Sequence, residues 1–264
     1  MVTLTNNIEI KIFPTANDLF QFGANDFKNR AIAAVNAKGN FSVVLAGGNT
    51  PKLFFDILTS VEDYKKNIPW QQIQFFFGDE RYVSSADEKS NYHTAYEHLF
   101  SKVPVNSKNI FRMPTELDNS EDVAKSYEQT LRQTFKIKDD AFPDFDLVYL
   151  GLGDNAHTAS LMPSSDLVKH FVNHSLTNNN QLVASLYVSE LNMNRITLTP
   201  PAINNAKAII FLVTGANKAN AVHEVLEEKL DPIHYPAQLI HCIQGKTIWY
   251  LDRLASTTLS FPTV

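Results

Sequence analysis

His157 is the residue of this chain whose type and position best suit acid–base chemistry. It lies in the segment Gly151–Pro163 (GLGDNAHTASLMP), directly after the apolar run Phe145–Leu150, and it is the one histidine of eight in such a strand-end loop. Because the unperturbed pKa of imidazole is about 6.5, this side chain can exchange a proton near neutral pH. Asp154 and Asn155 could hold its ring in one tautomer. The alternative is a histidine that only caps a helix of small residues.

A second cluster, Gly47-Gly48-Asn49-Thr50-Pro51, follows the apolar run Phe41–Ala46. Glycines after a strand let the backbone approach a ligand, and the free N–H groups and dipole of the next helix favour a phosphate. The alternative is a plain strand-to-helix turn, and the spacing matches neither GxGxxG nor a Walker A loop, so the pattern leaves both open. Arg195 and Lys218 could supply neutralising charge, although single cations are more often solvated.

The third cluster is Gly78-Asp79-Glu80-Arg81, which follows the apolar run Ile73–Phe77. Three adjacent charges after a buried strand mean that the chain leaves the core abruptly for a polar setting. Taken alone, this pattern favours a surface cluster of salt bridges over a functional site.

Short apolar runs alternate with helical segments, which predicts α/β layers around a largely parallel sheet in a single domain, residues 1–264. Ligands of such sheets sit at the carboxyl ends of the strands, so we expect the strand-end clusters to meet there. The expected strands are Glu9–Phe13, Phe41–Ala46, Ile73–Phe77, Phe145–Leu150, Val183–Val188, Arg195–Thr199, Ala208–Val213 and Trp249–Leu254. Helices are expected over 20–35, from Pro51 to about Leu58, from Ser90, over 123–135 and around 222–226.

Composition excludes several classes of protein. With 264 residues, a net charge of −5 and a pI near 5.9, the chain offers no basic face for nucleic acid, although a local cationic cleft for a small anion remains possible. One cysteine, Cys242, cannot form an internal disulfide, which favours a reducing compartment, and we expect it to be buried and inert. No zinc-type spacing, signal peptide or membrane-length apolar stretch is present, so we expect no metal site and no membrane association.

Six motifs in order resemble the 6-phosphogluconolactonase family, which is similar to the glucosamine-6-phosphate isomerases/deaminases. They are VVLAGGNTP at 43–51, FFFGDERYV at 75–83, SNY at 90–92, FDLVYLGLGDNAHTASLMP at 145–163, RITLTPPAIN at 195–204 and FLVTGANKA at 211–219. The resemblance implies a three-layer α/β/α sandwich with a mostly parallel, Rossmann-like sheet. It also implies a cytoplasmic hydrolase of the pentose phosphate pathway that acts on a phosphosugar lactone without a cofactor. We expect a monomer or a weak homo-oligomer.

The resemblance also implies roles for individual residues. His157 would be the general base, oriented by Asn155. Arg81, oriented by Asp79, would stabilise charge on the substrate or on the developing oxyanion. The 6-phosphate would be held by Gly47, Gly48, Asn49 and Thr50 together with Arg195 and Lys218.

The chain departs from the family directly before the histidine, where Asn155-Ala156 replaces the usual Asp-Gly. An asparagine carbonyl can orient an imidazole but stabilises its cation less than a carboxylate would, and Ala156 must adopt a backbone shape that glycine adopts more freely. Two alternatives remain. One is a sugar phosphate isomerase or deaminase, although Met162 stands where those relatives carry a glutamate; the other is a non-catalytic phosphosugar sensor.

Overall fold

The computed structural model describes residues 7–138, 140–173 and 180–260. The strands are β1 (Ile8–Phe13), β2 (Phe41–Leu45), β3 (Ile73–Phe77), β4 (Asp79–Arg81), β5 (Leu147–Leu150), β6 (Val183–Val188), β7 (Met193–Leu198), β8 (Ala208–Val213) and β9 (Lys246–Asp252). The α-helices are α1 (Ala16–Lys38), α2 (Asn49–Ser60), α3 (Glu62–Asn67), α4 (Asn91–Ala95), α5 (Ser120–Phe135), α6 (Asp166–Asn173), α7 (Pro200–Asn204) and α8 (Ala219–Leu226). A π-helical turn, Tyr96–Phe100, continues α4.

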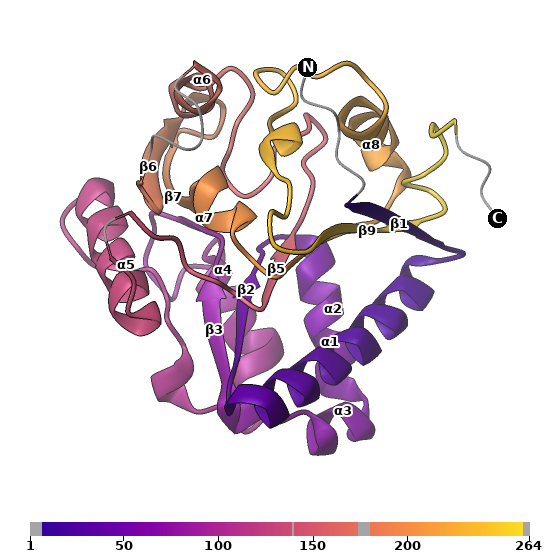
Figure 1. Cartoon of the computed structure of the whole chain (residues 1–264), viewed down its shortest axis with the longest axis vertical. Coiled ribbons are helices and arrows are strands. Elements are labelled where there is room, and N and C mark those ends of the chain that lie inside the picture. Colours follow the sequence, from indigo (N-terminus) through magenta and orange to yellow (C-terminus); the bar gives the residue numbers. More distant parts are fainter. Residues whose placement is uncertain (1–6, 139, 174–179, 261–264) are drawn as a thin grey trace.

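Six parallel strands form the main sheet in the order β1-β9-β8-β5-β2-β3. Helices α1, α2 and α3 lie on one side of this sheet, and α7 and α8 lie on the other (Figure 1). Parallel sheets are covered on both faces, and accordingly β2 and β8 are buried along their whole length. The predicted α/β sandwich with a largely parallel central sheet is therefore confirmed.

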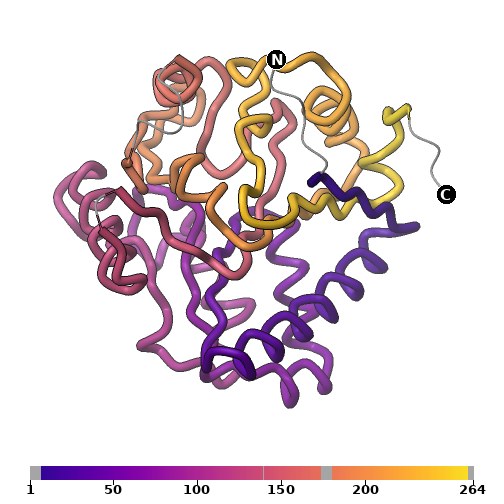
Figure 2. Tube along the Cα trace, viewed as in Figure 1, coloured from indigo at the N-terminus to yellow at the C-terminus, as the bar shows by residue number. Residues whose placement is uncertain are grey.

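Local sequence signals determine where the first helix begins and ends. The side chain of Thr15 accepts a hydrogen bond from the N–H of Asp18, and Gly39 ends the helix with φ of 84°. After α1 the chain enters β2, so β1 remains at the edge of the sheet. There it pairs with β9, which brings the first and last described strands side by side (Figure 2).

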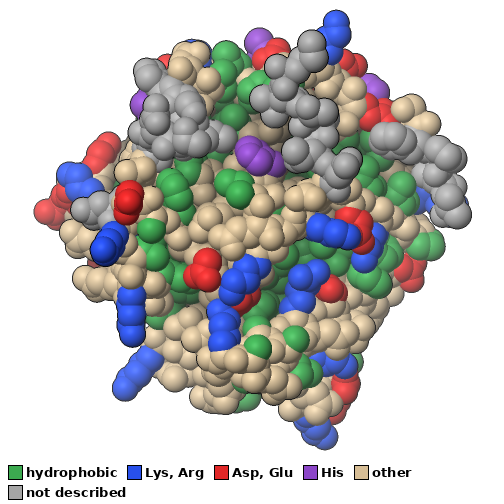
Figure 3. Space-filling model, in the orientation of Figure 1, with side chains coloured by type: hydrophobic (Ala, Val, Ile, Leu, Met, Phe, Trp, Pro, Cys, Tyr) green, Lys and Arg blue, Asp and Glu red, His purple; other side chains and the backbone are tan. Residues whose placement is uncertain are grey.

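One apolar cluster fills the space between the sheet and the helices. Aromatic rings contribute much of it; the rings of Phe211 and Trp249, for example, stack at 3.9 Å on neighbouring strands. Cys242 is buried as expected, and burial raises the pKa of its thiol, which keeps it protonated. On the face shown in Figure 3, cationic and anionic side chains are interspersed. No helix in the described residues is long and apolar enough to cross a membrane.

A second sheet, with the antiparallel order β4-β7-β6, extends from the end of β3. Its strand β4 consists of Asp79, Glu80 and Arg81, so the interpretation of this segment as a surface cluster of salt bridges is wrong. Asp79 and Glu80 are buried because β4 pairs with β7 and their carboxylates accept hydrogen bonds. Three charged residues in a row carry no apolar pattern typical of a strand, so the sequence does not predict β4. This strand forms because of its tertiary pairing with β7.

A buried carboxylate ties β2 to β5 near their amino ends. Oδ2 of Asp146 accepts hydrogen bonds from the backbone N–H and the hydroxyl of Ser42, at 2.8 and 3.0 Å. Nζ of Lys207 lies 2.8 Å from Oδ1, and Nζ of Lys38 lies 2.9 Å from Oδ2. Burial alone would raise the pKa of Asp146, but these partners lower it below the ordinary value. The ionised carboxylate is therefore part of the folded state.

We expect Asp146→Asn to lower the free energy of unfolding by about 1–3 kcal/mol, because the buried Ser42 and the two lysines lose an ionised partner. Because the pKa of Asp146 is lowered in the folded state, its carboxylate stabilises the fold at pH values above about 3.9, the pKa of an unfolded aspartate. The loss of unfolding free energy in Asp146→Asn should therefore shrink as the pH falls below this value. Urea denaturation between pH 3 and 7 measures both effects. Asp144→Asn is the matched control, because the exposed Asp144 lies 3.6 Å from the same lysine. Equal losses in both variants would contradict this role.

Candidate active site

One cleft at the carboxyl ends of the strands is lined by every residue that the sequence predicted for the site. It has a volume of about 720 Å³. Its lining includes Gly47, Gly48, Asn49, Thr50, Asp79, Arg81, Asn155, His157, Arg195 and Lys218. The expectation that distant loops meet at one edge of the sheet, with the imidazole beside a cationic pocket, is therefore confirmed. The described residues contain no group of three His, Cys, Asp or Glu side chains able to hold a metal ion.

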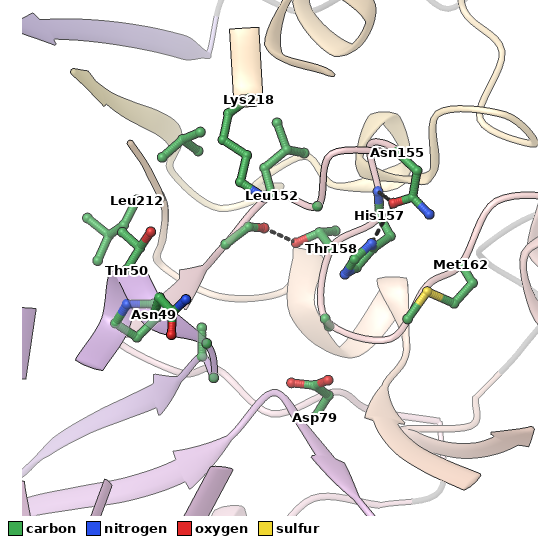
Figure 4. Close-up of a pocket in the computed structure, with 18 of the residues that line it drawn as sticks. Asn49, Thr50, Asp79, Leu152, Asn155, His157, Thr158, Met162, Leu212 and Lys218 are labelled. Carbon is green, nitrogen blue, oxygen red and sulfur yellow. Dashed lines mark hydrogen bonds between the residues drawn. The ribbon is translucent and has the colours of Figure 1, made fainter. Parts of the chain in front are cut away.

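His157 lies on the loop after β5, with Asn155 on one side of its ring and Asp79 across the cleft (Figure 4). Oδ1 of Asn155 lies 2.6 Å from Nδ1 of His157. A carbonyl oxygen can only accept, so Nδ1 carries the proton and Nε2 keeps a free lone pair. Burial lowers the pKa of His157 below 6.5, although the charge of Asp79 opposes this shift. The ring is therefore mainly neutral at pH 7 and can accept a proton at Nε2.

The backbone around His157 is strained and closely packed. Ala156, which is fully buried, has φ of 62°, so the loop adopts the left-handed conformation expected of this position. A Cβ at Gly153 would lie 2.0 Å from Nδ1 of His157. Gly153 therefore leaves the space that the imidazole occupies.

Asp79 is 6% exposed and has partners on several elements. Its Oδ2 accepts a 2.6 Å hydrogen bond from the hydroxyl of Ser160 and lies 3.5 Å from NH1 of Arg195. Its Oδ1 accepts a 3.0 Å bond from Nδ2 of Asn91. The prediction that Asp79 orients Arg81 therefore needs correction. The carboxylate contacts Arg195, whereas NH1 of Arg81 donates to the backbone carbonyl of Lys89.

Two arginines lie directly opposite each other at the cleft, because Arg81 of β4 pairs with Arg195 of β7. Like charges at opposing positions of a sheet destabilise it. Each guanidinium also has a buried Nε without a hydrogen-bond partner among the described residues. Burial lowers the pKa of Arg195, an effect that Asp79 partly offsets. The two opposed arginines destabilise the free protein, but they concentrate positive charge in the cleft. This concentration of charge suits an anionic ligand.

The turn before α2 provides backbone donors at the same cleft. Gly48 precedes the helix with φ of 100°, a conformation that favours glycine, and the first turn of this 12-residue helix contains no acidic side chain. The hydroxyls of Thr50 and Thr214 lie 3.2 Å apart. Lys218 forms an ion pair with Asp154, which lowers the pKa of that carboxyl. Asp154 therefore pairs with Lys218, whereas Oδ1 of Asn155 accepts the hydrogen bond from Nδ1 of the imidazole.

Sequence reasoning missed two residues of this network, Ser160 and Asn91. Both are buried, and both donate hydrogen bonds to Asp79. Each lies inside a motif noted in the sequence, but a serine and an asparagine carry no signal of their own. Only the contact with Asp79 reveals what they do.

Comparison with known proteins places the chain in a family. The profile of the glucosamine-6-phosphate isomerases/6-phosphogluconolactonase family matches residues 14–249. A 6-phosphogluconolactonase of Synechocystis sp. is 37% identical over 230 residues, covering 87% of this chain and 89% of the relative. A 6-phosphogluconolactonase of Nostoc sp. is 35% identical over 253 residues, covering 95% and 98%. The solved structure of the Trypanosoma brucei 6-phosphogluconolactonase is 26% identical with a TM-score of 0.82, covering 97% of this chain and 100% of that one.

The fold and the cleft thus define an α/β protein with a basic imidazole beside a cationic pocket. The chain belongs to the glucosamine-6-phosphate isomerase/6-phosphogluconolactonase family.

We expect His157 to titrate with a pKa below 6.5 and to carry its neutral-state proton on Nδ1, because burial disfavours the cation and the Asn155 carbonyl accepts from Nδ1. Long-range ¹H–¹⁵N spectra of histidine-labelled protein, recorded against pH, measure both. The spectrum of His157→Gln assigns the signals. A pKa at or above 6.5, or a proton on Nε2, would contradict this description of the ring.

Proposed function

We propose that the chain hydrolyses 6-phospho-D-glucono-1,5-lactone to 6-phospho-D-gluconate, with His157 as the general base. The observation that carries this proposal is the placement of the imidazole: its Nδ1 bonds Oδ1 of Asn155, which leaves Nε2 without a proton in the neutral ring, and it shares one cleft with two opposed arginines. The names of the Synechocystis and Nostoc relatives support the same substrate.

In the proposed reaction, Nε2 of His157 takes a proton from water as the water oxygen attacks the lactone carbonyl carbon. The carbonyl oxygen becomes an oxyanion in the tetrahedral intermediate. The bond from this carbon to the ring oxygen then breaks, and the imidazolium returns its proton to that oxygen. Asn155 keeps Nδ1–H fixed throughout, so the proton moves through Nε2 alone.

We assign Arg195 to the reacting end of the substrate. Burial is the main cause of the lowered pKa of His157, but the charge of Arg195 also lowers it, and more than that of Lys218 does. Arg195 and His157 also line the same cleft, and Oδ2 of Asp79 lies 3.5 Å from NH1 of Arg195, which supports assigning this guanidinium to the oxyanion. A preorganised donor of this kind typically contributes about 3–4 kcal/mol to lowering the barrier. This assignment exchanges the roles first expected for Arg81 and Arg195.

The Gly47–Thr50 turn, Arg81 and Lys218 then hold the 6-phosphate. The turn offers backbone N–H groups at the start of α2, and the two cations complement the negative charge. We also infer that residues 1–264 act as one domain, a monomer or weak homo-oligomer, in the cytoplasm, and that the reaction needs no cofactor.

The isomerase or deaminase chemistry of the same family has less support. Met162 lies in the cleft where that chemistry would place a carboxylate. A thioether cannot exchange a proton with a sugar ring. A non-catalytic sensor is also less well supported, because the Synechocystis and Nostoc relatives are named as 6-phosphogluconolactonases and the chain keeps a histidine in the cleft.

We expect His157→Ala to lower kcat by about 10²–10⁴-fold with little change in the binding of 6-phosphogluconate, because a general base contributes about this much. The assay couples the product of freshly made lactone to 6-phosphogluconate dehydrogenase and subtracts spontaneous hydrolysis. His98→Asn is the control, because His98 bonds Asp56 away from the cleft. Wild-type protein that does not exceed the spontaneous rate would refute the proposed function.

We expect Asn155→Asp to keep or raise turnover and to move the acidic limb of kcat/KM to higher pH. A carboxylate beside Nδ1 stabilises the imidazolium and so raises the pKa of His157. In the wild type the limb should lie below pH 6.5, since activity disappears as pH falls through the lowered pKa. A pH profile of both proteins measures this. A severe loss of activity, or a limb that moves to lower pH, would show that residue 155 does not orient the ring.

A further inference from the structure

Asn91 does not line the cleft, but it contacts two residues that do, Asp79 and Gly47. It is the first residue of α4 and is 3% exposed. Its Nδ2 donates to both the backbone carbonyl and Oδ1 of Asp79, at 2.9 and 3.0 Å. Its own N–H donates to Oε1 of Glu80 at 2.7 Å, which anchors its backbone to the same short strand. The amide is therefore held rigidly against Asp79.

The same amide fills the space above Gly47. A Cβ at Gly47 would lie 1.8 Å from Oδ1 of Asn91, 2.2 Å from Cγ and 2.6 Å from Nδ2. The backbone of Gly47 is not left-handed, so its conformation does not require glycine. Glycine is required here because a Cβ would clash with the amide of Asn91. One side chain thus touches both the turn before α2 and the carboxylate that holds Arg195.

We propose that Asn91 is a positioning residue that sets the Gly47–Gly48 turn and the Asp79 carboxylate at a fixed separation across the cleft. The donation to Oδ1 leaves Oδ2 of Asp79 directed at Ser160 and Arg195. The contact with Gly47 fixes how closely the turn approaches. This inference rests on the proposed function, since the two groups then act on the phosphate and on the lactone carbonyl of one substrate.

A double-mutant cycle tests the contact with Gly47. Gly47→Ala places a methyl group against the amide, and we expect kcat/KM to fall on the order of 10²-fold through a higher KM, since small displacements of positioning groups cost about this much. Asn91→Ala removes all three clashing atoms. The double variant should therefore be no less active than Asn91→Ala alone. Losses that multiply would overturn the proposed contact.

Asn91→Asp tests the hydrogen bond to Asp79 separately, because it keeps the shape of the side chain but replaces the donor with a second carboxylate. We expect kcat to fall by about 10-fold or more, and by a larger factor than KM rises, because Asp79 orients the arginine assigned to the oxyanion. Full activity in Asn91→Asp would overturn the role of Asn91. If Asn91→Ala does not fold, the kinetics of Asn91→Asp alone decide whether Asn91 positions Asp79.

Two control variants distinguish positioning from general stability. Gly78→Ala adds the same methyl group at ordinary contact distance, 3.5 Å from Val44. Asn204→Ala removes another fully buried amide, one that bonds the backbone of Leu239 and His241 away from the cleft. Both should keep kcat and KM even where urea denaturation shows a loss of stability. Losses of activity that simply follow stability in all variants would overturn the proposal, and inactive wild-type protein would overturn the proposed function as well.

Discussion

The site depends on the buried carboxylate of Asp79. This group lies where the chain leaves the main sheet for the second one, and it joins β4, β7, α4 and the loop after β5 through Arg195, Asn91 and Ser160. Burying a charge is costly unless its oxygens are satisfied, and here hydrogen bonds from Asn91 and Ser160 satisfy both. Because each partner comes from a different element, the carboxylate fixes the relative positions of all four. This one set of bonds therefore holds Arg195 at the cleft and ties together the elements around it.

In the cleft, the group that can accept a proton is neutral, and the positive charge is carried by other side chains. Three cations, Arg81, Arg195 and Lys218, line the same cleft as the imidazole of His157. Cations that are free in water also attract anions, but they are strongly hydrated. Here burial and the nearby Arg195 favour the neutral ring, while Asp79 and Asp154 limit how far the pKa falls. Asp154 and Asp79 also hold Lys218 and Arg195 in place. The electrostatic field is therefore organised before a ligand arrives, which reduces the reorganisation required during a reaction.

The main sheet and the residues of the cleft could be predicted because apolar runs mark parallel strands and their ends converge. Ile73–Phe77, Val183–Val188 and Ala208–Val213 have the predicted bounds. Strand β4 could not be predicted, because Asp-Glu-Arg carries no apolar signal and its pairing with β7 is a long-range contact. For the same reason the sequence could not tell which arginine Asp79 would meet. The strained backbone at Ala156 was foreseeable, since a loop that resembles Asp-Gly-His lacks its glycine.

The pairing of β1 with β9 affects how this protein folds during synthesis. Among the described strands β1 is the first to leave the ribosome, yet its partner in the sheet, β9, is the last of them to be made. Helix α1 likewise packs partly against β9, through rings such as Phe22 against Tyr250. Until that strand emerges, apolar surface on β1 and α1 remains uncovered and is a target for chaperones. Contacts between the two ends of a chain also slow folding, so completion of the sheet is expected to be the late step.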